Sequence, residues 1–140
     1  MEEPIKDFKE VENRLIILYL INSMVLPMSR AQITEMVSSG EFMDYYTLQQ
    51  NLTEMQNIGL LEASLENASD NNTTRFTLTE EGLNTLNFFE RRISFSTRQA
   101  INRLARENRR KIKKDYEKTA TYFPNDDNDE FRGGFPVPSG

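Results

Sequence analysis

Residues 45–61 read YYTLQQNLTEMQNIGLL, a stretch whose apolar residues recur at helical spacing. It ends in a glycine, which commonly follows the last turn of a helix, and it contains no Lys or Arg. The residues away from the apolar side are almost entirely Tyr, Gln, Thr and Asn. This pattern predicts a helix over residues 44–59 with one packing face and one uncharged polar face. We expect the packing face to consist of Leu48, Leu52, Met55 and Ile58.

Two further helices are predicted before this stretch. The first runs from Val11 to Val25, is apolar on most sides, and is stopped by Pro27, which lacks a backbone N–H donor. The second begins after Ser29, a residue type that often caps helix N-termini, and its apolar residues lie three and four positions apart. We expect Gly40 to adopt the left-handed conformation that closes this second helix.

The segment after the quoted stretch predicts a β-hairpin. Residues 60–66 (LLEASLE) and 73–78 (TTRFTL) have the composition of strands, and NASDNN at 67–72 is a dense run of turn-forming residues. Side chains alternate along a strand, so Arg75 should point to the face opposite Phe76. The hairpin should therefore have a polar tip with little positive charge.

Two more helices are predicted after the hairpin. Thr79 is suited to cap the first, whose apolar spacing continues to Ile93. The second should cover residues 97–118, where 9 Lys or Arg residues stand against 3 Asp or Glu residues and the apolar stripe is thin. Residues 120–140 are rich in Asp, Asn, Gly and Pro, which predicts a flexible tail.

Three helices followed by a hairpin are typical of a winged helix-turn-helix, here with a C-terminal helical extension. The predicted fold class is mainly α with a small β-hairpin (α+β). We divide the chain into an N-terminal arm at 1–10, a winged helix-turn-helix domain at 11–93, a basic C-terminal helix at 94–119 and the tail. In such a domain the outer face of the third helix is free to enter a DNA major groove.

Four segments of this chain resemble a known family, and the similarity covers about residues 11–118. They are LIILYLI at 15–21, YYTLQQ at 45–50, GLL at 59–61 and FTLTEEG at 76–82. They are similar to a bacterial winged-helix family described as a domain of unknown function, and more distantly to winged helix-turn-helix transcriptional regulators. The resemblance implies a sequence-specific DNA-binding regulator.

The composition excludes several other classes of protein. The chain has no His and no Cys, which argues against zinc sites and hydrolytic triads, and we expect no enzyme activity, catalytic residue, metal or cofactor. It has no secretory signal pattern and no apolar run long enough for a membrane span, so a cytoplasmic protein is expected. The net charge of −5 is uneven, because residues 1–93 have a net charge of −8 and residues 94–140 of +3.

The polar face of the third helix is the predicted site for double-stranded DNA. Gln can pair with adenine, and Thr and Tyr can reach phosphates or thymine methyl groups. An ordinary solvated face and a hairpin without DNA contacts remain alternatives, and Tyr45 or Tyr46 could instead anchor the helix in the core. The predicted DNA-binding residues are Arg30, Tyr46, Thr47, Gln49, Gln50, Thr53 and Arg75.

The thin apolar stripe of the last helix suggests a homodimer, in which the stripe packs on a second copy of the chain. Its basic residues could also contact phosphates or neutralise the acidic body of the same molecule. The predicted dimerisation residues are Phe89, Ile93, Ile101, Leu104 and Ile112.

A winged-helix module that binds a protein instead of DNA is the main alternative function. The location of the positive charge distinguishes the two. DNA is favoured if folding brings Arg30, Arg75 and the basic helix onto the face of the third helix, and a protein partner is favoured if that face stays negative.

Overall fold

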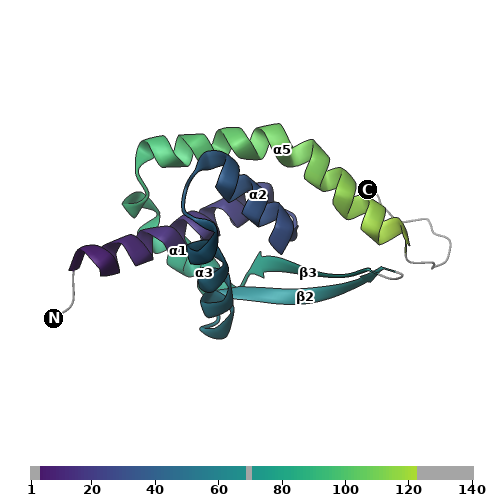
Figure 1. The fold of residues 1–140 in the computed structure, drawn as a ribbon, viewed down its shortest axis with the longest axis horizontal. Coiled ribbons are helices and arrows are strands. Elements are labelled where there is room, and N and C mark those ends of the chain that lie inside the picture. Colours follow the sequence, from purple (N-terminus) through teal and green to yellow (C-terminus); the bar gives the residue numbers. More distant parts are fainter. Residues whose placement is uncertain (1–3, 69–70, 123–140) are drawn as a thin grey trace.

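The structure, a computed structural model, describes residues 4–68 and 71–122 (Figure 1). The prediction of a mainly α chain with a small antiparallel β part is confirmed. The elements are α1 (Pro4–Met24), β1 (Met28–Ser29), α2 (Arg30–Gly40), α3 (Tyr45–Asn57), β2 (Leu61–Ala68), β3 (Asn71–Leu78), α4 (Glu80–Phe89), the 3-10 helix η1 (Glu90–Arg92) and α5 (Phe95–Tyr122).

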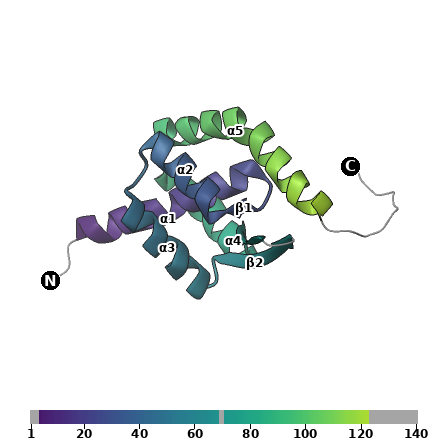
Figure 2. The ribbon, with the colours of Figure 1, turned by 45° about the vertical axis from the view of Figure 1, so that its right-hand side comes forward.

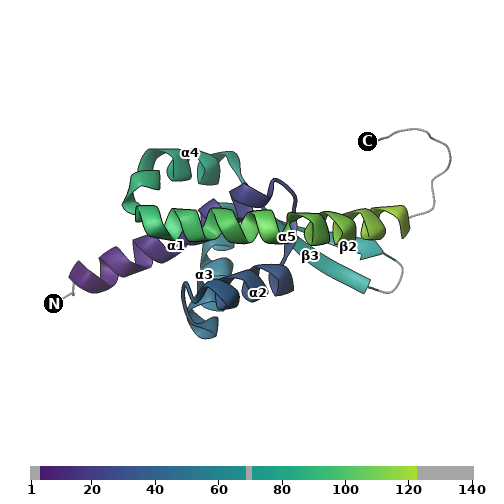
Figure 3. The same ribbon diagram turned by 90° about the horizontal axis from the view of Figure 1, so that it is seen from above.

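Helix α1 is the centre of the fold. It contacts α3, α4, α5 and β3, and the apolar residues of its second half are almost completely buried. Helices α2 and α3 lie on one side of α1 and α4 lies on the other (Figure 3). The helix begins at Pro4 rather than at Val11, so most of the segment expected as an N-terminal arm extends α1. Proline is well suited to a first helical turn, where its missing N–H would have no partner.

Helix α2 starts as predicted and ends differently. The Ser29 hydroxyl accepts from the Gln32 backbone N–H, and the Gln32 side chain accepts from the Ser29 N–H, which forms a capping box. The left-handed residue at the end is Glu41, with φ 55°, and the prediction that it would be Gly40 is wrong. Gly40 is the last helical residue, and a Cβ there would lie 2.4 Å from the ring of Phe42. A side chain at this position would therefore require the Phe42 ring to move.

Helix α3 packs through most of its predicted face. Leu48, Leu52 and Met55 are fully buried, but Ile58 is 56% exposed, so its assignment to the packing face is wrong. The helix ends at Asn57, and Ile58 therefore no longer follows the helical period. Gly59 closes the helix with φ 87°, as expected.

The hairpin is longer and tighter than predicted. Strands β2 and β3 pair in antiparallel register from Leu61 opposite Leu78 to Ala68 opposite Asn71. Most of the predicted turn NASDNN therefore belongs to the strands, because cross-strand pairing overrides the local turn preference. The remaining two residues, 69–70, lie outside the described part of the chain. Strand β1 pairs with β3 through only two residues and was not predicted.

The segment FTLTEEG joins the sheet to α4 by a close contact. The Thr79 hydroxyl accepts from the Gly82 N–H, which confirms Thr79 as the cap of α4. A Cβ on Gly82 would lie 2.1 Å from the carbonyl oxygen of Leu60, so only glycine lets α4 approach the exit of α3 this closely. The predicted single helix up to Ile93 is divided, because α4 ends at Phe89 and a 3-10 turn follows.

Helix α5 crosses above α1 and α2 and then descends toward the hairpin (Figures 1 and 2). It starts two residues before the predicted position and continues to Tyr122, beyond the predicted end. The remainder of the expected flexible tail, residues 123–140, lies outside the described residues. Among those that are described, no helix is long and apolar enough to cross a membrane.

Candidate nucleic-acid interface

The outer face of α3 carries four exposed polar side chains in one line. Tyr46, Gln50, Thr53 and Asn57 follow one another at intervals of four, three and four residues, which places them on the same side of the helix. All four are exposed, and Tyr46 is 72% exposed. Tyr45 is similarly exposed, so neither tyrosine anchors the helix in the core. The face offers amide and hydroxyl groups and no formal charge.

One flank of α3 is fixed to α1 by an arginine. Arg14 donates from Nε to Asn51 Oδ1 at 3.0 Å and from Nη2 to Glu54 Oε1 at 2.6 Å. Asn51 is only 4% exposed and donates in turn to the Thr47 carbonyl oxygen. The sequence pattern did not identify this network, although a lone Arg in an apolar helix is a signal for it. The ion pair offsets the charge of Glu54, which would otherwise repel a phosphate near α3.

Asp44 and Thr47 form the first turn of α3. The Asp44 carboxylate accepts from the Thr47 backbone N–H at 2.7 Å, so Asp44 is the cap of α3. This backbone hydrogen bond, followed by a side-chain hydrogen bond from Thr47, lowers the pKa of the exposed Asp44 carboxyl group below its ordinary value. Thr47 is half-buried and takes part in this cap, so only part of its side chain is available for DNA.

Two predicted DNA-binding residues are joined to each other between α2 and α3. Arg30 donates from Nη1 to Gln49 Oε1 at 2.7 Å, and Gln49 donates from Nε2 to Thr34 Oγ1 at 2.8 Å. The Arg30 guanidinium also lies 5.3 Å from the centre of the Phe76 ring. Both polar atoms of the Gln49 amide thus have partners within the protein. Their contacts fix the angle of α3 on α2 and leave the half-buried Arg30 beside the outer face of α3.

Arg75 does not lie on the surface. It is 4% exposed, its guanidinium lies 5.6 Å from the centre of the Tyr116 ring of α5, and Nη1 is 3.5 Å from Gln32 Oε1. In this structure it is not accessible to a DNA phosphate, contrary to expectation. It does point away from the buried Phe76, as strand alternation predicted, but α5 covers that face of the hairpin.

The residues predicted for dimerisation are mostly buried within one chain. Ile93 and Ile101 are fully buried, Ile112 is 3% exposed, and Leu104 packs at the edge of the same core. The stripe of α5 faces α1 and α2, and Tyr19 of α1 donates from its hydroxyl to Asn102 Oδ1 at 3.0 Å. Phe89 alone of the predicted set is appreciably exposed. The expectation that this stripe packs on a second chain is therefore wrong for its buried members.

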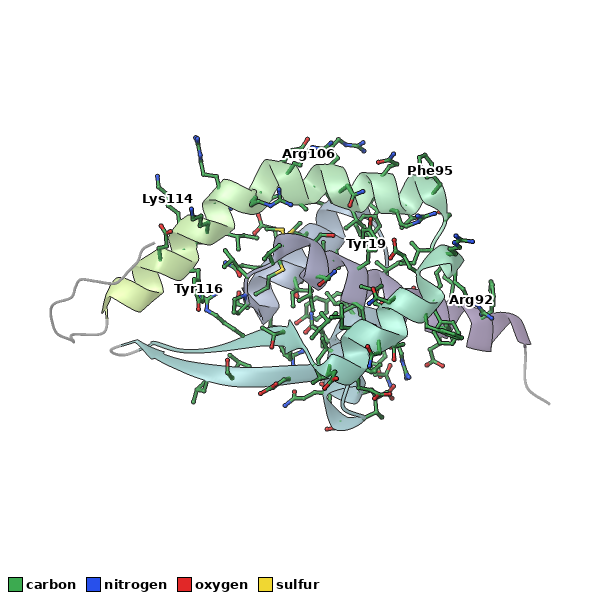
Figure 4. All side chains as sticks on the ribbon, turned by 180° about the vertical axis from the view of Figure 1, so that it is seen from behind. Tyr19, Arg92, Phe95, Arg106, Lys114 and Tyr116 are labelled. Atoms are coloured by element: carbon green, nitrogen blue, oxygen red, sulfur yellow. The ribbon has the colours of Figure 1, made fainter. Side chains whose placement is uncertain are left out.

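Exposed aromatic side chains instead gather at the end where α4, η1 and the start of α5 meet the first turns of α1. Phe8, Phe88 and Phe95 are all more than half exposed. The guanidinium of Arg92 lies 5.4 Å from the ring centre of Phe8 and 5.7 Å from that of Phe89. Figure 4 shows Arg92 and Phe95 at this end of the molecule. Composition alone did not single out this aromatic end, because its residues come from four separate elements.

Within residues 4–68 and 71–122, no group of three or more Asp or Glu side chains is arranged to hold a metal ion. A family model described as "Domain of unknown function (DUF4364)" matches residues 13–131. No curated protein and no solved structure matches the chain. Because the family model covers most of the sequence, the chain belongs to the DUF4364 family.

Proposed function

We propose that this member of the DUF4364 family is a bacterial winged helix-turn-helix protein that binds double-stranded DNA sequence-specifically and regulates transcription. Helices α2 and α3 would form the helix-turn-helix, and β2 and β3 the wing. The observation that supports this most is the exposed line of Tyr46, Gln50, Thr53 and Asn57 on a helix that is held by both α1 and α2. A rigid helix with outward hydrogen-bonding groups suits the reading of base edges in a major groove.

In this reading Gln50 and Asn57 are the candidates for pairing with adenine, because side-chain amides can bond bidentately to that base. Thr53 lies between them and can contact a thymine methyl group, while Tyr46 at the start of α3 is placed to reach a phosphate. Arg30 beside this face supplies a positive charge, and it must exchange its bond to Gln49 for a phosphate when DNA binds.

The protein would act as a homodimer, and its interface would lie at the aromatic end rather than along the α5 stripe. Phe8, Phe88, Phe89 and Phe95 together expose roughly 400 Å² at typical side-chain areas, about half of what one partner contributes to a standard interface. Replacing Phe88 and Phe95 by Ser should yield a folded monomer in light scattering. An unchanged mass would remove this end from the proposed interface.

The experiment that tests DNA reading selects binding sites from a random duplex library and compares the double variant Gln50→Ala plus Thr53→Ala with the unmodified protein. The expected loss is about 10- to 100-fold in preference for the selected sequence, since a good base contact is worth about 1–3 kcal/mol. The matched control is Asn84→Ala plus Asn87→Ala, two exposed polar residues of α4 on the other side of α1 (Figure 3). Equal selectivity of all three proteins would reject base reading by α3.

A protein-binding module is the second candidate, and the scarcity of free positive charge at α3 favours it. The exposed residues of α3 include no cation, Arg75 is buried, and Arg30 is engaged with Gln49. Such a face would attract phosphates weakly and would suit an uncharged protein surface. This candidate predicts no enriched duplex in the selection, together with a protein partner whose binding is lost in the Gln50→Ala plus Thr53→Ala variant.

A further inference from the structure

A row of positive charge lies on the outer side of α5. Ile101, Ala105 and Ile112 define the buried side of this helix, and four cations lie on the opposite side, at intervals of three, four and four residues. These are Arg103, Arg106, Arg110 and Lys114, hereafter the outer cation row. Figure 4 shows Arg106 and Lys114 on the side of α5 that faces away from the rest of the molecule.

The cations of the outer row differ from the other basic residues of α5 in their partners. Lys111 pairs with Glu35 at 3.7 Å, Lys113 pairs with Glu117 at 3.8 Å, and Arg109 donates to the Ser23 carbonyl oxygen. In the described residues, the four cations of the row have no ion-pair or hydrogen-bond partner and all are exposed. Two acidic residues of the described part of α5 lie beside the row: Glu107, which is exposed, and Glu117, which follows Lys114 by three residues and pairs with Lys113. The charge of the row is therefore available to an external anion.

We propose that the outer cation row of α5 binds the phosphate backbone of a nucleic acid duplex, and that this duplex segment is not the one that faces α3. The row extends over about 16 Å, since eleven residues of helix rise about 1.5 Å each, so it can follow several successive phosphates. Three of its four members are arginines, whose planar guanidinium groups bond bidentately to phosphate oxygens.

The other anionic partners fit this face less well. A membrane-surface helix needs apolar residues to enter the lipid, but the apolar side of α5 is buried in the protein core. A protein interface is usually centred on aromatic or aliphatic side chains, and the outer cation row offers none. A repeating array of phosphates needs only charge and hydrogen-bond donors, which the row supplies.

The order of the helices separates the two surfaces. Helix α1 contacts both α3 and α5 and lies between them (Figure 1). The outer row lies on the side of α5 opposite its buried stripe, and the line from Tyr46 to Asn57 lies on the side of α3 opposite its buried stripe. One protomer therefore cannot lay both surfaces on the same stretch of duplex. The statement that α3 and α5 hold different duplex segments rests on the proposed function of α3, whereas phosphate binding by α5 does not.

The first test measures binding of a fluorescent duplex of scrambled sequence by anisotropy at several salt concentrations. For the unmodified protein, log K should fall with log salt at a slope of about −3 to −4, because each neutralised phosphate contributes about −0.9. The variant Arg103→Gln, Arg106→Gln and Arg110→Gln should reduce that slope by about 2.7. The control Lys9→Gln, Arg91→Gln and Lys111→Gln removes the same charge elsewhere and should keep the slope.

Equal slopes for the unmodified protein and the outer-row variant would overturn the proposal, as would the absence of any salt-dependent binding near 50 mM salt. Stronger binding of polyglutamate or of anionic vesicles than of the duplex would overturn it in favour of an acidic protein or a lipid surface. The Gln50→Ala plus Thr53→Ala variant should bind the scrambled duplex normally. If that variant loses sequence selection, or if the unmodified protein shows no sequence selection, the result bears only on the proposed function of α3 and not on phosphate binding by α5. Circular dichroism verifies that each variant is folded.

The second test asks whether two duplexes are held at once. A bead-bound duplex with the selected sequence should capture a second, labelled duplex of scrambled sequence in the presence of the protein. Capture should fall at least tenfold with the outer-row variant, while binding to the bead-bound duplex remains. Capture that persists in this variant would show that α5 does not hold the second segment.

Discussion

Helices α3 and α5 are built alike and differ in what their outer faces offer. Each has a narrow apolar stripe, and both stripes are buried in the core of the same chain. The outer face of α3 is polar and uncharged, whereas the outer face of α5 bears the four cations of the outer row. An apolar stripe in a sequence therefore indicates that one side of a helix is buried, but not which surface covers it.

The largest effect should come from the stripe of α5. Ile101→Ala should lower the free energy of unfolding of the protomer by about 2–4 kcal/mol, because it leaves a cavity where α5 meets the core. Urea denaturation measures this, with light scattering on the same samples. Gln99→Ala on the same helix is the control, and its exposed side chain should contribute far less to stability. An Ile101→Ala protein of native stability but half the mass would instead place the stripe at a dimer interface.

The junction at the exit of α3 should give the next largest effect. Gly82→Ala should cost about 1–3 kcal/mol, because the added methyl group overlaps the Leu60 carbonyl oxygen and forces α4 away from the end of α3. Thermal unfolding measures the loss, and amide chemical shifts should change around Gly59 and Leu60.

The contrasting change at this junction is Gly59→Asn. Glycine is favoured at position 59 because the backbone has φ 87°. A Cβ at Gly59 would meet no atom within 4 Å, so packing does not require glycine there. Asparagine tolerates this left-handed conformation better than most residues, so the variant should lose less stability than Gly82→Ala. The opposite order would mean that α4 can shift without cost.

Gln49→Ala should have a smaller effect on stability and a measurable effect on the salt dependence of duplex binding. It removes the bonds to Arg30 and Thr34, at a cost of about 1 kcal/mol for partly buried groups. It also frees Arg30 beside the face of α3, so in the background of the outer-row variant, where α5 no longer dominates, binding of a scrambled duplex should gain about one unit of salt slope. Gln50→Ala, at an exposed neighbouring position, should change neither quantity appreciably. If Gln49→Ala leaves the slope unchanged, Arg30 does not reach a phosphate.

The parts of the fold that the sequence predicts well are those with local causes. The caps at Ser29 and Thr79 and the glycine that closes α3, Gly59, each depend on a few neighbouring residues, and all three are confirmed. The exposed α3 line also follows from helical spacing alone. Local pattern is thus sufficient where a structure is decided within one or two turns.

The parts that the sequence did not reveal depend on residues far apart in the chain. Arg75 is buried because α5, which begins twenty residues later, lies over its face of the hairpin. The bond between Arg30 and Gln49 joins two helices whose crossing angle no local pattern encodes. The isoleucines of α5 are apolar whether they face a second chain or their own, so only the packed structure decides between these partners.

The smallest expected effect concerns the charge at the start of α3. The pKa of Asp44 is lowered in the folded state by hydrogen bonds from Thr47, so folding favours its charged form. Its contribution to stability is therefore present above the ordinary carboxyl pKa of about 4 and is lost as the pH falls through the lowered value. Asp44→Asn keeps a good cap without a titrating group. The unfolding temperature of this variant should fall less between pH 5 and pH 2 than that of the unmodified protein, and parallel curves would show that the Asp44 charge contributes nothing.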